Sequence, residues 1–476
     1  MQMISFLFFG LMAVTLLALY GVGKLAKNDE ACVSASNRVL LIASYLFCAY
    51  ADWKFAIVLA IITLVTWYCA RTQKLSWLGI LVSAAALVFF KYTNFFAESF
   101  AKLLGHNYTQ LTLLLPLGIS FYTFSAIGYI VDVSKGKLKA ESLENVALYL
   151  SFFPKLTSGP IQKDIDFFGQ IKQRRAIAWN LIGDGLQIFI FGLFKKLVLA
   201  DRLSVFVNQV YDTPLAFGSL TVLGAAVAYS LQIYFDFSGY SDMAIGVGRM
   251  LGIDLPRNFN LPYLAHNVTE FWKRWHITLS AWLQEYIYIP LGGSRKGKAR
   301  TYGNLILTMA IGGIWHGANW TFVIWGLLNG IALAVHKIWM ECTGSKKKKH
   351  SAAANLISIV CTFLFTTLCW IFFRAESLSK AMLIIRRILS FDDGLQQPYL
   401  WLFAAMMILC AASWLAMKQT DPTDSVSKAT NVSCVVGYYP VVRLSEFWGL
   451  VLFFVFCGLL ICLAYTGGSP FIYGNF

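Results

Sequence analysis

Two histidines, His276 and His316, are the residues of this chain best suited to acid–base chemistry, and the chain has only 6 histidines. His316 lies in the segment 315–320, with sequence WHGANW, between two apolar segments. His276 ends the aromatic-rich segment 271–276, with sequence FWKRWH. An imidazole titrates near neutral pH and is costly to place in hydrocarbon, so a histidine there is a functional candidate. The alternative for each is a buried side chain that is satisfied by a backbone carbonyl.

The elements that must position these histidines are membrane helices. The chain has 476 residues, of which 58% are hydrophobic and 13% charged, and soluble proteins carry about twice that charged fraction. We predict an all-α polytopic membrane protein with about 11 to 13 transmembrane helices around a central chamber, together with re-entrant and short amphipathic helices. The predicted spans are 4–22, 38–52, 54–70, 76–92, 111–131, 180–200, 219–236, 303–316, 320–339, 355–373, 399–417 and 447–466.

Three segments are too irregular for simple spans. Residues 115–118 (LPLG) and 153–160 contain prolines and glycines that break helices inside apolar surroundings. Residues 237–300 carry further glycines and prolines and predict short amphipathic pieces. Non-helical backbone at membrane depth needs protein or a water-filled cavity around it. We therefore expect one integral-membrane domain over 1–476, divided into N-terminal spans (1–236), a catalytic core (237–340), C-terminal spans (341–466) and an exported-side tail (467–476).

The net charge of +15 comes from basic clusters that lie in loops. Such clusters indicate cytoplasmic loops in contact with anionic lipid, and none belongs to a soluble domain that could bind nucleic acid. The run 346–349 (KKKK) is expected in the cytoplasm, which places the C-terminus on the exported side, and the first span is expected to have its N-terminus on the same side. The first apolar segment has no basic residue before it and predicts an uncleaved span. With this topology residues 380–388 fall on the exported side, where we expect them to form an interfacial amphipathic helix.

Other polar groups in apolar segments have simpler interpretations. The ten cysteines do not follow a metal-ligand spacing, and we interpret them as packing residues. Two histidines forty residues apart make a poor metal site. We interpret three further charged residues, Asp236, Asp242 and Arg249, as members of structural ion pairs. Asp242 and Arg249 would lie on one face of a helix.

Five segments together resemble a known family. They are 118–121 (GISF), 153–161 (FPKLTSGPI), 234–242 (YFDFSGYSD), 271–293 and 315–317 (WHG). In this order they resemble the membrane-bound O-acyltransferases, in the bacterial branch that O-acetylates exported polysaccharides such as alginate and peptidoglycan. The likeness extends over nearly the whole chain.

The resemblance implies an acyl-CoA-dependent acetyltransferase with no permanently bound cofactor and acetyl-CoA as donor. It makes His316 the catalytic histidine and His276 a second site residue. A reference pKa of about 6.5 suits a base that takes a proton from an attacking hydroxyl. The chain ends in FIYGNF where the branch commonly has FIYFxF, so the match departs at Gly474. The branch suggests Tyr473 as an acyl relay; an interfacial aromatic anchor is the alternative.

Several neighbours could support this chemistry. The phosphates of acetyl-CoA call for basic residues, and Lys273, Arg274, Arg295 and Lys296 are candidates. Ordinary cytoplasmic loop charge explains these four equally well. Asn319 could donate a hydrogen bond to the oxyanion, with Trp315 in support. A turn between two helices is the other role for Asn319.

The sequence thus predicts a multi-pass acetyltransferase of the bacterial inner membrane. It would move acetyl from cytoplasmic acetyl-CoA to an exported cell-surface polysaccharide, with an extracytoplasmic SGNH-hydrolase-like partner implied by the branch. A transporter or lipid-linked sugar flippase is the alternative, although no inverted repeat favours it. A scaffold for polymer export is a third possibility.

Overall fold

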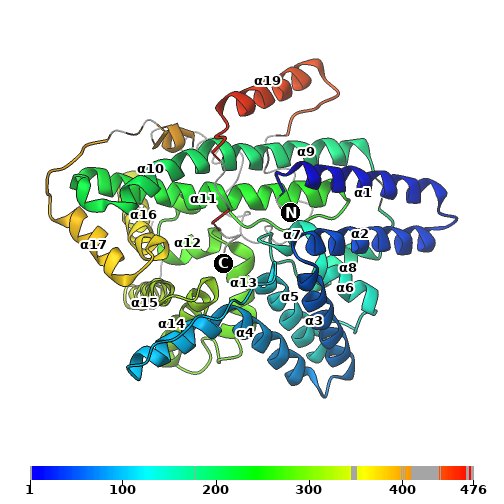
Figure 1. Ribbon diagram of the computed structural model, residues 1–476, viewed down its shortest axis with the longest axis horizontal. Helices are drawn as coiled ribbons and strands as arrows, with labels where there is room; N and C mark the ends of the chain where they lie inside the picture. The colour runs from blue at the N-terminus through cyan, green and yellow to red at the C-terminus, as the bar shows by residue number, and fades with distance from the viewer. Residues whose placement is uncertain are drawn as a thin grey trace. The chain divides into compact units, whose positions relative to one another are not determined.

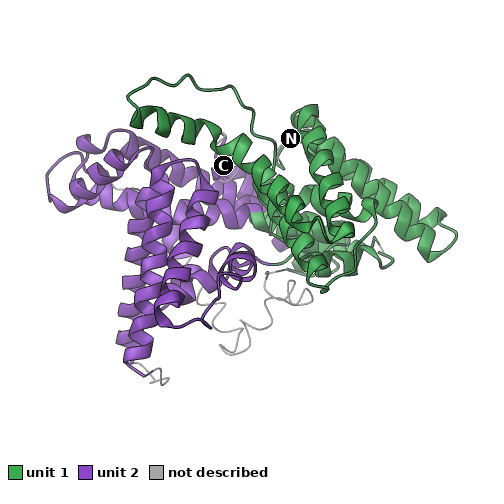
Figure 2. Cartoon of the chain, turned by 90° about the horizontal axis from the view of Figure 1, so that it is seen from below, with its two compact units in different colours: residues 1–190, 241–256, 432–450 green, residues 191–240, 257–431, 451–476 purple. Residues whose placement is uncertain are grey.

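The computed structural model describes residues 3–175, 177–344, 351–397, 399, 401–402, 404–408, 439, 441–467 and 471–472. All regular elements in these ranges are helices (Figure 1). The chain divides into two compact units, coloured separately in Figure 2. Unit 1 comprises 1–190, 241–256 and 432–450, and unit 2 comprises 191–240, 257–431 and 451–476.

Unit 1 is built from the N-terminal helices. They are α1 (Phe6–Leu25), α2 (Asp29–Ala51), α3 (Trp53–Thr72), α4 (Ser76–Leu103), α5 (Ile119–Ser134), α6 (Leu143–Ser151), α7 (Phe153–Leu156), α8 (Asp164–Ile171) and most of α9 (Trp179–Phe194). Many outward side chains of α1 to α4 are large and apolar, as lipid contact requires.

Unit 2 holds most of the remaining helices. They are the π-helix η1 (Lys195–Ala200), α10 (Asp201–Asp212), η2 (Pro214–Ala216), η3 (Pro262–Leu264), α12 (Val268–Arg274), α13 (Ile277–Leu283), the π-helix η4 (Gln284–Tyr288), α14 (Lys298–His316), α15 (Trp320–Cys342), α16 (Ala352–Arg374) and α17 (Leu378–Leu389). Two helices, α11 (Ser219–Met250) and α19 (Phe447–Leu463), contribute residues to both units.

Seven of the described helices are long and apolar enough to cross a membrane: α1, α2, α3, α4, α11, α15 and α16. Two further helices, α5 and α19, are apolar but shorter. The predicted class of all-α polytopic membrane protein is therefore confirmed. The predicted span 180–200 is α9 followed by η1, and 303–316 is the second part of α14. Most of the predicted span 399–417 lies outside the described residues.

The helix break predicted at 115–118 is present, and its cause is a close contact. Residues 106–116 are not helical, and α5 begins only after Gly118. Gly118 has a φ of +75°, and a Cβ there would lie 2.1 Å from the carbonyl oxygen of Leu156. Only glycine fits both constraints, so the predicted span 111–131 loses its first turns.

The prediction that residues 237–300 consist of short pieces is wrong for the first part of this range. Helix α11 runs unbroken to Met250, well beyond the predicted end at residue 236. Gly239 and Gly246 lie within this helix at close contacts, because a Cβ would meet the carbonyl oxygen of Gly192 at 2.7 Å and that of Gly185 at 2.5 Å. These glycines permit backbone approach within a helix and do not end it.

Candidate active site

The helical hairpin of α14 and α15 positions His316. His316 is the last residue of α14, and residues 317–319 form the turn into α15. The two helices pack closely because Gly313 and Gly326 face each other: a Cβ on Gly313 would lie 3.0 Å from the Cα of Gly326. Small residues at such positions let helix backbones approach. The hairpin thus fixes the place of His316 at its tip.

The His316 ring lies inside an aromatic enclosure. The residue is 2% exposed. Its ring meets Trp325 edge-to-face at 5.0 Å between centroids and Phe373 at 5.3 Å, while the neighbouring Trp315 lies at 5.0 Å. These contacts come from α14, α15 and α16 and fix the plane of the imidazole. His316 therefore does not face lipid.

His276 is held just before α13 in a left-handed conformation, with φ 42° and ψ 55°. It is 0% exposed and packs edge-to-face on Phe237 at 4.7 Å. Such a backbone conformation is uncommon outside glycine and asparagine and is often found at functional sites. The loop residue Asn258 maintains it, because its backbone carbonyl accepts from the Ile277 N–H at 2.9 Å.

The side chain of Asn258 also selects the tautomer of His276. Its Oδ1 accepts from the Thr278 hydroxyl at 2.6 Å and lies 3.3 Å from His276 Nδ1. Because this oxygen is an acceptor, Nδ1 carries the proton and Nε2 keeps its lone pair. Burial lowers the pKa of His276 to about 3, so the imidazole is neutral at physiological pH. A neutral ring can accept a hydrogen bond from a substrate hydroxyl.

The indole ring of Trp315 lies close to both histidines. The Trp315 ring lies 6.4 Å from the His276 ring and 5.0 Å from the His316 ring, centroid to centroid. The structure therefore brings together two histidines that are forty residues apart in the sequence. Trp315, a predicted supporting residue, contacts both rings.

Asn319 is engaged at the hairpin turn. Its Oδ1 accepts from the Thr321 N–H at 3.0 Å, which caps α15, and its Nδ2 donates to the carbonyl of Glu376 at 2.8 Å. Both ends of the amide therefore have structural partners. This geometry favours the turn role over donation to an oxyanion.

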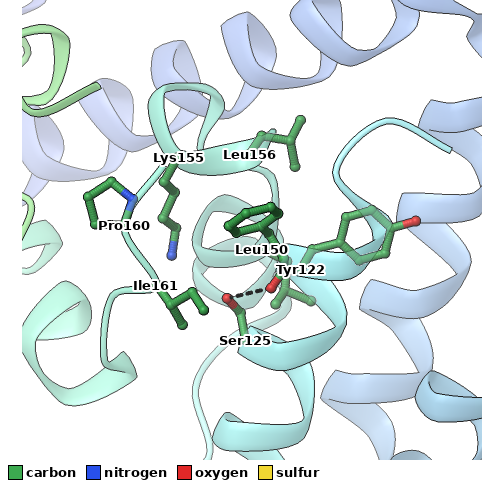
Figure 3. A pocket seen from close by; sticks show the side chains of 8 residues that line it. Tyr122, Ser125, Leu150, Lys155, Leu156, Pro160 and Ile161 are labelled. Atoms are coloured by element: carbon green, nitrogen blue, oxygen red, sulfur yellow. Dashed lines mark hydrogen bonds between the residues drawn. The ribbon is translucent and has the colours of Figure 1, made fainter. Parts of the chain in front are cut away.

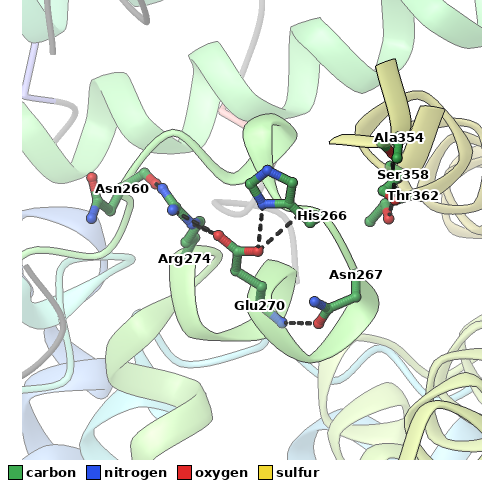
Figure 4. A network of polar contacts seen from close by, with 8 residues as sticks. All are labelled: Asn260, His266, Asn267, Glu270, Arg274, Ala354, Ser358 and Thr362. Atoms are coloured by element: carbon green, nitrogen blue, oxygen red, sulfur yellow. Dashed lines mark hydrogen bonds and ion pairs between the residues drawn. The ribbon is translucent and has the colours of Figure 1, made fainter. Parts of the chain in front are cut away.

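The basic candidates fall into two places. Arg274 ends α12, where its guanidinium donates to Glu270 Oε1 at 2.7 and 3.0 Å; Figure 4 shows this pair with His266 on the second carboxylate oxygen. Lys273, beside it, is exposed. Arg295 and Lys296 are also exposed, in the turn before α14. Lys273, Arg295 and Lys296 are thus accessible to an anion, whereas Arg274 already has a carboxylate partner.

Similarity to known proteins shows the family to which this chain belongs. A model of the MBOAT, membrane-bound O-acyltransferase family matches residues 65–378, which include both histidines and all four basic candidates. The chain belongs to this family. It is therefore an O-acyltransferase and a multi-pass membrane protein.

Relatives in bacteria are similar over most of the chain. A peptidoglycan O-acetyltransferase of Helicobacter pylori is 39% identical over 73% of this chain and 72% of its own length. A probable alginate O-acetylase AlgI of Pseudomonas syringae pv. tomato is 40% identical over 75% of this chain and 70% of its own. A teichoic acid D-alanyltransferase of Bacillus subtilis is 25% identical over 76% and 94%.

The C-terminal segment of this acyltransferase enters unit 2. Phe471 is buried against Tyr240, with ring centroids 4.8 Å apart, and the Ile472 N–H donates to Asp236 Oδ2 at 2.8 Å. Tyr473, the predicted relay, lies outside the described residues.

The pairing predicted for Asp242 and Arg249 is wrong. Arg249 Nη1 binds Asp254 at 2.9 Å, in the turn that follows α11, whereas Asp242 accepts from the Tyr439 hydroxyl at 2.7 Å. A shared helical face did not decide the partners, because an acceptor in the following loop binds Arg249 and a donor from a distant segment binds Asp242.

Sequence reasoning missed the residues that hold the histidines. Asn258, Trp325 and Phe373 contact the imidazoles, but each lies in a different segment. No local spacing connects them to a histidine. Only the aromatic richness of the WHGANW and FWKRWH segments hinted at an aromatic enclosure.

Unit 1 of this acyltransferase has a small pocket of its own, lined by Tyr122, Ser125 and Lys155 among apolar side chains (Figure 3). Lys155 Nζ lies 3.9 Å from the centre of the Tyr149 ring and 4.8 Å from that of Phe167. Neither histidine of the candidate site lines this pocket.

Proposed function

We propose that this chain transfers acetyl from cytoplasmic acetyl-CoA to an exported cell-surface polysaccharide, in the inner membrane of a bacterium. The observation that carries the proposal is the contact of both His276 and His316 with Trp315, within a member of an O-acyltransferase family. Relatives named peptidoglycan O-acetyltransferase and alginate O-acetylase support acetyl as the group and polysaccharide as the acceptor.

In the proposed reaction His316 is the general base. A hydroxyl oxygen attacks the thioester carbonyl while an imidazole nitrogen of His316 takes the hydroxyl proton. The C–O bond forms, the C–S bond breaks, and the coenzyme A thiolate takes the proton from the imidazolium as it leaves. His276, neutral and with a lone pair at Nε2, orients the attacking hydroxyl. The aromatic enclosure excludes water, which would otherwise hydrolyse the thioester.

The acceptor hydroxyl is proposed to belong to Tyr473 first. Its phenol oxygen takes the acetyl group as an ester, and an extracytoplasmic partner of the SGNH-hydrolase type passes it to the polymer. Lys273 is proposed to hold the phosphates of acetyl-CoA at the cytoplasmic side, with Arg274, Arg295 and Lys296 as further contacts. Both termini are proposed to lie on the exported side, as the basic loops favour.

The test is the variant His316→Ala in living cells. It should lower the acetate content of the polymer by at least about 100-fold, the usual contribution of a general base, at an unchanged protein level in the membrane. The matched control is His106→Ala, which removes an exposed histidine outside the site and should leave acetylation unchanged. Wild-type acetate content in His316→Ala would refute the proposal.

Labelled acetyl-CoA separates this function from transport. The purified protein should release free coenzyme A from the labelled donor and become acetylated or acetylate an acceptor. A transporter or flippase would leave the thioester intact.

A further inference from the structure

Unit 2 contains a buried cluster of three charged side chains. Lys196 Nζ lies 2.7 Å from Asp236 Oδ1 and 2.8 Å from Asp201 Oδ1. Lys196 is 1% exposed, and both aspartates are buried. Two carboxylates thus bind the same ammonium. A buried carboxylate is stable only when further donors satisfy its oxygens.

The C-terminal segment supplies such a donor. The Ile472 N–H donates to Asp236 Oδ2 at 2.8 Å, so Asp236 binds the lysine with one oxygen and the tail with the other. The preceding residue reaches the same cluster, because the Lys196 ammonium lies 4.4 Å from the centre of the Phe471 ring. A cation over an aromatic face is a favourable contact, and more so away from water.

The segment around Lys196 also binds the residues at the end of α19 and just after it. The carbonyl of Leu197 accepts from the Tyr465 N–H at 2.9 Å, and Arg202 donates to the carbonyl of Leu463 at 3.1 Å. Lys196 and Leu197 belong to the π-helix η1, and Arg202 follows in α10. Isolated π-helical turns occur often at functional sites, since they redirect side chains and backbone groups.

Residue 239 of α11 allows the cluster to form. A Cβ at Gly239 would lie 2.7 Å from the carbonyl oxygen of Gly192 and 3.1 Å from the Cβ of Lys195. The glycine therefore lets α11, which carries Asp236, approach the turn that carries Lys196. The segment YFDFSGY thus places a carboxylate and a close contact one helical turn apart.

We propose that Lys196 and Asp236 form a clamp that seats the C-terminal segment 471–472 in unit 2, and that this seating is required for acyl transfer. The second half rests on the proposed function, in which Tyr473, the residue that follows Ile472, receives acetyl. Lys196 and Asp236 are positioning residues: they act on the reaction by fixing the chain next to the relay.

Amide hydrogen exchange of the full-length protein, resolved to single residues by fragmentation, tests the seating directly. Asp236→Leu removes the acceptor of the Ile472 N–H and leaves Lys196 paired with Asp201. The Ile472 amide should exchange at least tenfold faster in this variant. The Tyr465 amide, bound to the carbonyl of Leu197, should keep its wild-type rate and reports that the fold is intact.

The matched control is Asp201→Leu, which also removes one carboxylate from Lys196 but does not touch the tail. It should leave the Ile472 exchange rate within twofold of wild type. Asp236→Asn, which keeps an oxygen acceptor of the same size, should lie between wild type and Asp236→Leu. It also serves as the second variant if the leucine variant does not fold.

Polymer acetylation in cells tests the functional half. Asp236→Leu should lower it at least tenfold, and Asp201→Leu should keep it within twofold of wild type. An unchanged Ile472 exchange rate in Asp236→Leu would overturn the seating. Faster exchange with normal acetylation would overturn the requirement for transfer. If His316→Ala also acetylates normally, the proposed function fails, while the exchange data still decide whether the clamp exists.

Discussion

At the scale of single residues, Gly317 is the position in the WHG segment with no room for a side chain. A Cβ there would lie 2.1 Å from the Phe322 ring, although its backbone is extended and open to any residue. Phe322 packs on Phe373 at 4.9 Å, and Phe373 in turn contacts the His316 ring. Gly317→Ala should therefore displace the aromatic enclosure. We expect a loss of about 1–3 kcal/mol of stability and a loss of acetyl transfer.

Thermal unfolding and polymer acetylation together check this expectation. The control is Gly303→Ala in the preceding helix, α14, where a Cβ would meet nothing within 4 Å. Alanine is favoured over glycine inside a helix by roughly 0.5–1 kcal/mol, so this variant should be as stable as wild type or more so. Equal behaviour of the two variants would show that contact with Phe322 does not constrain the site.

Lys155 provides a prediction about pH. Burial lowers its pKa from the ordinary 10.5 to about 7, and the charge of nearby Asp164 opposes the shift. Between these two values the folded lysine is neutral while the unfolded lysine is charged, so unfolding takes up a proton. Stability therefore rises with pH from about 7 to 10.5, by at most about 1.4 kcal/mol per pH unit.

Lys155→Met removes the titrating group and should abolish this rise. The measurement is the unfolding midpoint of detergent-solubilised protein at pH 7 and pH 9.5, with the exposed Lys163→Met as control. Wild type and the control should gain stability over this range relative to Lys155→Met. Parallel pH profiles for all three proteins would contradict the burial of a neutral amine.

At the scale of elements, the α14–α15 hairpin sets the place of His316. A Cβ on Gly326 would lie 2.5 Å from the carbonyl oxygen of Met309, and one on Gly330 would lie 2.7 Å from the Cα of Ile306. Gly326→Val should force the helices apart and lower acetylation at least tenfold, while Gly303→Val on the open face should have a small effect. Acetylation assays at matched membrane levels distinguish these outcomes. Normal activity of Gly326→Val would show that tight packing is unnecessary.

The length of α14 separates the two groups of basic candidates. Arg295 and Lys296 lie in the turn before α14 and His316 ends this helix, which is about 27 Å long. Lys273 is three residues from His276, a reach of at most about 11 Å. Lys273→Gln should therefore raise the KM for acetyl-CoA about tenfold, the effect of one charge-assisted hydrogen bond. Lys296→Gln should change it less, and the reverse order would reassign the donor site.

Helix type and approximate extent could be predicted from the sequence, since apolar length decides them in a membrane. The predicted span 320–339 corresponds to α15, and 355–373 to α16. Glycine was misleading in α11, because a residue that often ends a helix also permits close helix contacts. Gly118 and Gly239 look alike in the sequence, yet only the first has a positive φ.

At the scale of the whole molecule, the family and enzyme class could be predicted from the sequence, whereas the construction of the site could not. His276 and His316 stand out as rare polar residues in apolar surroundings, and the family match includes both. Their common contact with Trp315 and the role of Asn258 depend on how segments from different parts of the chain meet. Neither periodicity nor spacing encodes such meetings. The same limit explains why the partner of Asp236 proved to be Lys196, forty residues earlier.

The central claim is that His316 initiates the cleavage of a thioester. The most direct measurement is the release of free coenzyme A from labelled acetyl-CoA by the purified full-length protein, compared among wild type, His316→Ala and His106→Ala. We predict that His316→Ala releases coenzyme A at least about 100-fold more slowly than the other two. Equal release by all three proteins would contradict the account.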